Sequence, residues 1–209
     1  MAYTVRLIDC TDSISSDDQT AISGQLNTWI SAADSTRPTD KRLGVNIGWV
    51  TTLDSPTTAR LVIYFVTDRG SSVLKFMRNF KDPPNWDRLS GLTFSDSHPY
   101  VIRGGVRHYT RDELSACEVY TAKSGDAKAM ATYAFHEAMH NQLHMGDEMH
   151  GDQKIGGGIA ADTVKPGTTP TNENLTALGS AMDTVRPQWV EGYARAHPKN
   201  ATTPLRPQH

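Results

Sequence analysis

The chain has 209 residues, 37% of them hydrophobic and 21% charged, and its formal net charge is −2 at pH 7. This length suits one globular domain with its own core. The weak negative charge excludes the basic footprint by which proteins bind nucleic acids or anionic membranes, and no apolar run approaches the roughly 20 residues that span a bilayer. We therefore expect neither a nucleic acid nor a membrane among the partners.

The amino-terminal segment predicts the first strand of the fold rather than a leader. It lacks a basic region followed by a long apolar stretch, which a secretory signal peptide would contain. We therefore expect a cytoplasmic protein, or one that is exported or injected by a leaderless route as the cargo of a delivery apparatus.

Short strands and one amphipathic helix are predicted before residue 126. Ile22, Leu26 and Ile30 recur at four-residue spacing and predict a helix over residues 16–33. Turn-forming residues predict irregular chain at 82–100. β-rich runs predict strands at residues 5–8, 43–51, 60–67, 100–103 and 118–122, and a short helix is predicted at 71–80.

The strongest predicted helix covers residues 126–145. Ser124 or Asp126 is placed to cap its start, and Gly146 can end it in the left-handed conformation. A glycine-rich loop over residues 155–159 follows, and then two short helices at 174–182 and 188–196.

This order of elements predicts a mixed α+β domain over residues 1–196, with two lobes around a cleft. The upper lobe, residues 1–146, would contain a twisted mixed sheet backed by helices. The lower lobe, residues 147–196, would be small and loop-rich. The proline-containing residues 197–209 predict a flexible tail.

The long predicted helix carries the pattern H-E-x-x-H, as His136, Glu137 and His140. Histidines four residues apart project from one helix face, so both imidazoles can reach one zinc ion at about 2.0–2.1 Å. The zinc lowers the pKa of a bound water, and Glu137 between the histidines is placed to take the proton from that water. The motif therefore predicts one catalytic Zn²⁺ with Glu137 as the general base.

A catalytic zinc needs a third protein ligand and one open position. His144 lies eight residues after His136, about 12 Å along a straight helix, so it cannot join the same ion. The ligand must come from chain that turns back after Gly146. His150 and Asp147 both qualify, and Glu148 stays an alternative.

The stretch from His136 to His150 resembles the metzincin family of zincin-type zinc metallopeptidases, whose pattern is H-E-x-x-H-x-x-G-x-x-H or -D. In this chain Leu143 stands at the family's glycine position, and the turn glycine is three residues later, at Gly146. The helix is then longer by about 4.5 Å, and an extended chain needs one or two more residues to return. Together with the resemblance, this favours His150 over Asp147 as the third ligand.

The metzincin resemblance implies a zincin-like fold and a zinc-dependent endopeptidase acting on a protein or peptide substrate. The segment Gly179-Ser-Ala-Met182-Asp is similar to the Met-turn that lies under the zinc in that family. A second segment, Trp189-Val-Glu191-Gly-Tyr-Ala194, is similar to the gluzincin peptidases, and this resemblance implies Glu191 as the third ligand instead.

Three other functions compete with proteolysis. A structural or binding module could hold the metal without turnover, although such a site needs no base beside its histidines. A metal-dependent nuclease would need a basic groove, which the charge does not predict. Cys117 could be a nucleophile, but its position in a predicted strand disfavours this role.

Overall fold

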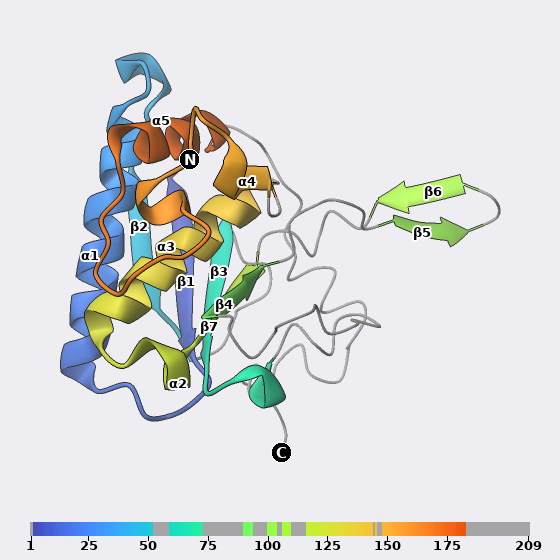
Figure 1. Cartoon of the computed structure of the whole chain (residues 1–209). Helices are drawn as coiled ribbons and strands as arrows, with labels where there is room; N and C mark the ends of the chain where they lie inside the picture. Colours follow the sequence, from blue (N-terminus) through green and yellow to red (C-terminus); the bar gives the residue numbers. More distant parts are fainter. Residues whose placement is uncertain are drawn as a thin grey trace.

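The main sheet contains five strands in a mixed arrangement (Figure 1). The structure is a computed structural model that describes residues 2–51, 59–72, 90–93, 100–103, 106–109, 116–143, 145 and 148–182. In spatial order the strands of the main sheet are β2 (Val45–Trp49), β1 (Tyr3–Asp9), β3 (Leu61–Val66), β7 (Ala116–Tyr120) and β4 (Gly91–Thr93). Neighbouring strands from β2 to β7 are parallel, whereas β4 runs antiparallel to β7 at the edge of the sheet.

Two long helices and three short ones accompany this sheet within the described residues (Figure 1). They are α1 (Ser16–Ser35), α2 (Thr121–Ser124), α3 (Ala127–Leu143), α4 (Glu148–Gly151) and α5 (Asn172–Ala181). Single 3₁₀ turns occur at Thr39–Lys41, Arg69–Ser71 and Gly158–Ala160, and β5 (Tyr100–Arg103) pairs with β6 (Val106–Tyr109) in a separate antiparallel ribbon. No helix of the described chain is long and apolar enough to cross a membrane.

One face of the sheet and helices α1, α3 and α5 enclose the hydrophobic core. Alternate residues of β3, namely Leu61, Ile63 and Phe65, are fully buried in the same cluster as Ile22 of α1 and Phe135 of α3. This alternation is what a strand produces when every second side chain points to one face. Helix α1 contacts α3 and α5, and α3 contacts β7 and β4, so the histidine-bearing helix lies against the edge of the sheet.

Side chains that bond to backbone N–H groups set the ends of these elements. Ser15 accepts a hydrogen bond from the amide of Asp18 at 3.1 Å and caps α1. Asp126 does the same for α3, because its carboxylate accepts from the amide of Ala129 at 2.7 Å. Asp126 is therefore the cap of α3, and Ser124 instead donates to the carbonyl of Tyr120. The buried carboxylate of Asp34 accepts from the amides of Leu43 and Gly44 and holds the entry to β2.

The structure confirms the mixed α and β fold, together with most predicted strands and helices that fall on described residues. The prediction of irregular chain over residues 82–100 is wrong at β4, whose three residues are too short to produce an alternating pattern. Strand β6 and helices α2 and α4 were not predicted, and α2 takes the last two residues of the strand predicted at 118–122. The helix predicted at 71–80 is described only at residues 71 and 72, where the 3₁₀ turn Arg69–Ser71 ends. Its other residues, the helix predicted at 188–196, the tail at 197–209 and Gly146 lie outside the described residues.

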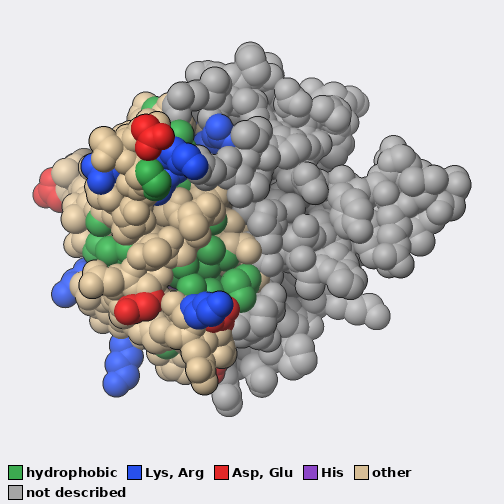
Figure 2. All heavy atoms as spheres, turned by 90° about the horizontal axis from the view of Figure 1, so that it is seen from above, with side chains coloured by type: hydrophobic (Ala, Val, Ile, Leu, Met, Phe, Trp, Pro, Cys, Tyr) green, Lys and Arg blue, Asp and Glu red, His purple; other side chains and the backbone are tan. Residues whose placement is uncertain are grey.

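The part of the chain after residue 147 contributes to the same core as the sheet. Met149, Ile155, Ile159 and Leu178 are buried in the cluster that contains the β3 and α3 side chains. The division into lobes at residues 146 and 147 stays a prediction. On the face seen in Figure 2, Lys and Arg side chains are interspersed with Asp and Glu over the described residues, without a continuous basic stripe.

Candidate metal centre

Helix α3 presents His136 and His140 one turn apart near its carboxyl-terminal end. Its buried side carries small residues, including Ala131, Ala134 and Ala138, which let the helix backbone approach the sheet closely. Phe135 packs edge-on against Trp29 of α1, with ring centroids 5.6 Å apart. These contacts fix the rotation of α3 about its axis, and with it the direction in which the histidines point.

His150 reaches the same place from the short helix α4, which lies beside the end of α3 in Figure 1. The chain leaves α3 after Leu143, and the amide of Met145 donates to the carbonyl of His140 at 3.2 Å. Met149, fully buried in the core, anchors α4 beside the end of α3. The expectation that an extended chain returns to the site is therefore wrong, since His150 lies on a helical turn.

The Nε2 atoms of these three histidines, hereafter the histidine triad, face one another. His140 Nε2 lies 3.1 Å from His136 Nε2 and 3.0 Å from His150 Nε2, and the ligand atoms of all three residues lie within 4.8 Å of one another. Three nitrogens on one tetrahedral zinc would be about 3.3 Å apart, as Zn–N distances of about 2.0–2.1 Å require. The triad could therefore hold one metal ion.

Each imidazole of the triad uses its other nitrogen to contact an oxygen of the protein. Nδ1 of His136 lies 2.6 Å from the carbonyl of Ile159, and Nδ1 of His140 lies 2.9 Å from that of Met145. Nδ1 of His150 lies 3.3 Å from a carboxylate oxygen of Asp162. An oxygen acceptor favours the proton on Nδ1, which leaves the Nε2 lone pair for a metal.

Burial, followed by the neighbouring His140, lowers the pKa of His136 to about 3. His136 is therefore neutral at pH 7, which is the form in which an imidazole binds a metal.

Glu137 is buried, with an exposed fraction of 8%, between the two α3 histidines in sequence. Desolvation, and secondarily the buried carboxyl of Glu118, raises the pKa of Glu137 to about 8. A divalent cation held by the triad would favour the ionised form and lower this pKa. The carboxyl group is thus poised to exchange a proton near neutral pH.

Gly91 of β4 makes room for the Glu137 side chain. A Cβ atom at position 91 would lie 2.7 Å from Cγ and 2.8 Å from Oε1 of Glu137, and also 2.7 Å from the carbonyl oxygen of Glu118. Only glycine fits between these groups without a shift of the strand or of the carboxyl group. Gly91 was not predicted as a site residue, because it falls in the segment that was predicted to be irregular.

The alternative third ligands Asp147, Glu148 and Glu191 stay predictions. Asp147, Glu191 and His144 lie outside the described residues, and Glu148 begins α4. Met182 is buried at the end of α5, and its role as a Met-turn stays a prediction. Burial raises the pKa of the Cys117 thiol, which disfavours the thiolate that a nucleophile needs.

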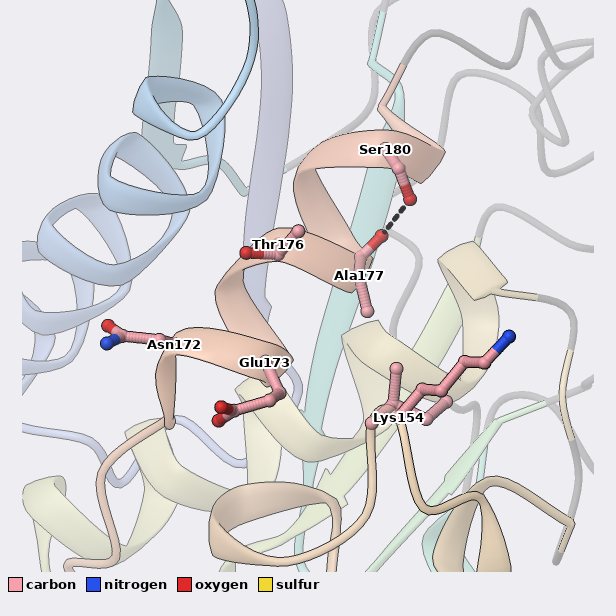
Figure 3. Close-up of a pocket in the computed structure, with 7 residues that line it drawn as sticks. Lys154, Asn172, Glu173, Thr176, Ala177 and Ser180 are labelled. Carbon is pink, nitrogen blue, oxygen red and sulfur yellow. Dashed lines mark hydrogen bonds between the residues drawn. The ribbon is translucent and has the colours of Figure 1, made fainter.

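A separate pocket of about 320 Å³ lies beside α5 (Figure 3). Its lining includes none of the three triad residues. Lys154 and Glu173, its charged lining residues, are both exposed and point in different directions (Figure 3). We assign no chemistry to this pocket.

Comparisons with protein-family models, with curated proteins and with solved structures find no match for this chain.

Replacing Asp162 with asparagine is expected to weaken metal binding by about 10- to 100-fold, because the side chain that orients His150 loses its charge. Isothermal titration with Zn²⁺ measures this change. Asp152→Asn is the matched control, since Asp152 accepts a hydrogen bond from the amide of Lys154 and contacts no triad residue through its side chain in the described chain. Equal affinities for the Asp162 variant and the wild type would contradict a role of Asp162 in the metal centre.

Proposed function

We propose that this protein is a zinc-dependent endopeptidase, with His136, His140 and His150 as the zinc ligands and Glu137 as the general base. One observation carries the proposal: the Nε2 atoms of three buried or half-buried histidines converge, and a buried carboxylic acid lies on the helix that supplies two of them. The resemblance of this segment to the metzincins supports the same assignment.

The donor set fits zinc and leaves room for a reactant. Three imidazoles with oxygen acceptors at Nδ1 are the kind of ligands that catalytic zinc sites use, whereas a structural site closes with a fourth protein ligand. A bound zinc ion would supply a Lewis acid that makes water more acidic and polarises a carbonyl group. Within the described residues the triad has no fourth His, Cys, Asp or Glu donor, and this favours catalysis over a purely structural role.

The carboxylate of Glu137 would carry the proton between the reactants. In its ionised form it accepts a proton from the attacking water, and the protonated carboxyl group then donates this proton to the leaving amine. Burial supports both steps, because it brings the pKa of Glu137 close to neutrality. An exposed glutamate with an ordinary pKa would be a weaker acid–base partner at pH 7.

Strand β4 supports a peptide as the substrate. It pairs with β7 along one edge, and no other strand of the described chain pairs with its opposite edge. The strand contacts α3 and touches the general base through Gly91. An extended peptide can add to such an edge by main-chain hydrogen bonds, which would bring a peptide bond close to Glu137.

Removal and return of the metal test this function directly. The purified protein is expected to contain about one zinc ion per chain and to cleave an unfolded protein such as reduced, alkylated casein. Treatment with 1,10-phenanthroline should abolish cleavage, and one equivalent of Zn²⁺ should restore it. Cleavage that survives a verified loss of zinc would contradict the proposal. Bound zinc without cleavage of a peptide library would favour the metal-binding module instead.

A further inference from the structure

Asn174 in the first turn of α5 uses its whole amide group to hold two other segments of the chain. Its side chain is fully buried. Its Oδ1 accepts from the amides of Thr171 at 3.0 Å and Ile159 at 3.2 Å, and its Nδ2 donates to the carbonyls of Ile155 at 2.7 Å and Gly157 at 3.4 Å. Two donors and two acceptors are the full capacity of an amide side chain.

Three of these bonds go to the segment Ile155–Ile159, hereafter the glycine loop, whose conformation depends on its glycines. Gly157 and Gly158 have φ values of 81° and 53°, in the left-handed region that side chains other than glycine rarely adopt. A Cβ atom at position 158 would also lie 2.8 Å from Oδ1 of Asn174. Because a run of three glycines has no side chains of its own to anchor it, Asn174 supplies the anchor.

The glycine loop ends at a residue that contacts the metal centre. The amide of Ile159 donates to Asn174, and its carbonyl lies 2.6 Å from Nδ1 of His136, the shortest of the three Nδ1 contacts of the triad. Ile159 itself is fully buried. The single residue Ile159 therefore connects the Asn174 side chain, which binds its amide, with the imidazole of His136, which contacts its carbonyl.

We infer that Asn174 is a positioning residue of the metal centre: it holds the glycine loop so that the Ile159 carbonyl fixes the proton and the ring orientation of His136. This inference rests on the metal site proposed above and adds a residue 38 positions away from His136 in the sequence. Without Asn174 the loop loses its anchor and His136 loses a fixed acceptor. The imidazole can then turn or move its proton to Nε2, where a proton blocks metal binding.

Titration of the metal-free protein with Co²⁺ tests this inference, because cobalt bound by nitrogen ligands absorbs visible light and the spectrum reports the coordination geometry. Asn174→Ala is expected to weaken Co²⁺ binding by about 10-fold and to alter the visible spectrum. Asn174→Asp keeps the acceptor oxygen but replaces the donor Nδ2 with a second acceptor oxygen opposite the carbonyls of Ile155 and Gly157, so it should also bind more weakly. Gly158→Ala should reproduce the effect from the loop side, and it provides a second variant if Asn174→Ala does not fold.

The control is Asp34→Ala, which removes a comparable clamp elsewhere. Asp34 is buried and holds the amides of Leu43 and Gly44. This variant should lose stability in thermal unfolding, yet the folded protein should bind Co²⁺ with the wild-type affinity and spectrum.

Three outcomes would contradict the inference. Wild-type affinity and spectrum in folded Asn174→Ala would overturn the role of Asn174 and leave the metal site intact. An equal loss of affinity in Asp34→Ala would show that the effect follows stability rather than positioning. A wild-type protein that binds neither Co²⁺ nor Zn²⁺ would instead overturn the metal site itself, and the inference with it.

Discussion

Replacing Glu137 with glutamine is expected to lower the rate of peptide hydrolysis by about 10²- to 10⁴-fold and to leave the zinc content unchanged. Glutamine has nearly the same shape as glutamate and fits the space beside Gly91, but it cannot accept a proton from water. Because Glu137 is not assigned as a ligand, the metal should stay bound. Initial rates on a cleaved peptide and metal analysis of the same sample measure the two quantities.

The fold should survive this substitution. Burial raises the folded-state pKa of Glu137 to about 8, above the usual value of a glutamate in an unfolded chain. The metal-free folded state therefore disfavours the ionised carboxylate, and its stability declines as the pH rises from about 4.5 to 8. Glutamine is neutral and removes this loss of stability. At pH 8 the free energy of unfolding of the metal-free variant should therefore be at least as large as that of the metal-free wild type.

The pH dependence of catalysis offers a second measurement on the same pair of proteins. A general base must be ionised, so kcat/KM should rise with pH through the pKa of Glu137. This acidic limb should lie below pH 8, because a bound divalent cation favours the carboxylate. The residual activity of Glu137→Gln should lack that limb. An unchanged rate in the glutamine variant would exclude Glu137 as the base and leave the triad as a site without this mechanism.

Local patterns in the sequence identified helix α1 and the histidine-bearing helix α3. Ile22, Leu26 and Ile30 revealed α1 by their helical spacing, and the spacing of His136 and His140 placed two histidines on one helix face. Such periodicities are set by the backbone geometry of a single element. They are readable without knowledge of what the element packs against.

Contacts between distant segments were not readable in the same way. Ile159 and Met145 contact the triad through their backbone carbonyls, and such contacts cannot be predicted from the residue type. In the sequence, Asp162 and Asn174 look like ordinary polar residues. In the fold, Asp162 contacts His150 of the triad, and Asn174 binds the glycine loop. The need for glycine at position 91 becomes clear only in the fold, where β4 lies against Glu137.

The prediction of the third ligand shows most clearly how far sequence spacing can go. Backbone dimensions favoured His150 over Asp147, and the structure brings His150 into the triad. The route was wrong, since an extended return was expected and α4 is helical. The sequence spacing limited the distance that the chain can cover after Gly146. The position of α4 follows from the burial of Met149 in the core.

Replacing His150 with alanine is expected to weaken zinc binding at least about 10²-fold, as heavily as His140→Ala does, because either change leaves only two of the three imidazoles for the ion. His150 Nε2 lies 3.0 Å from His140 Nε2, so removal of either ring opens the same cluster. The loss should exceed that of Asp162→Asn, which keeps all three imidazoles. Competition with a coloured zinc chelator measures affinities over the necessary range.

His144→Ala is the matched control for this experiment. It removes an imidazole from the same stretch of chain, and the sequence predicts that this imidazole does not bind the ion, because eight residues of straight helix would separate it from His136 by about 12 Å. Its zinc affinity should stay within about twofold of the wild type, because an imidazole outside the coordination sphere contributes little to binding. If Asp147→Ala strips the metal while His150→Ala does not, the aspartate is the ligand. If only Glu191→Ala does so, the gluzincin resemblance is the correct one and the triad is not the zinc site.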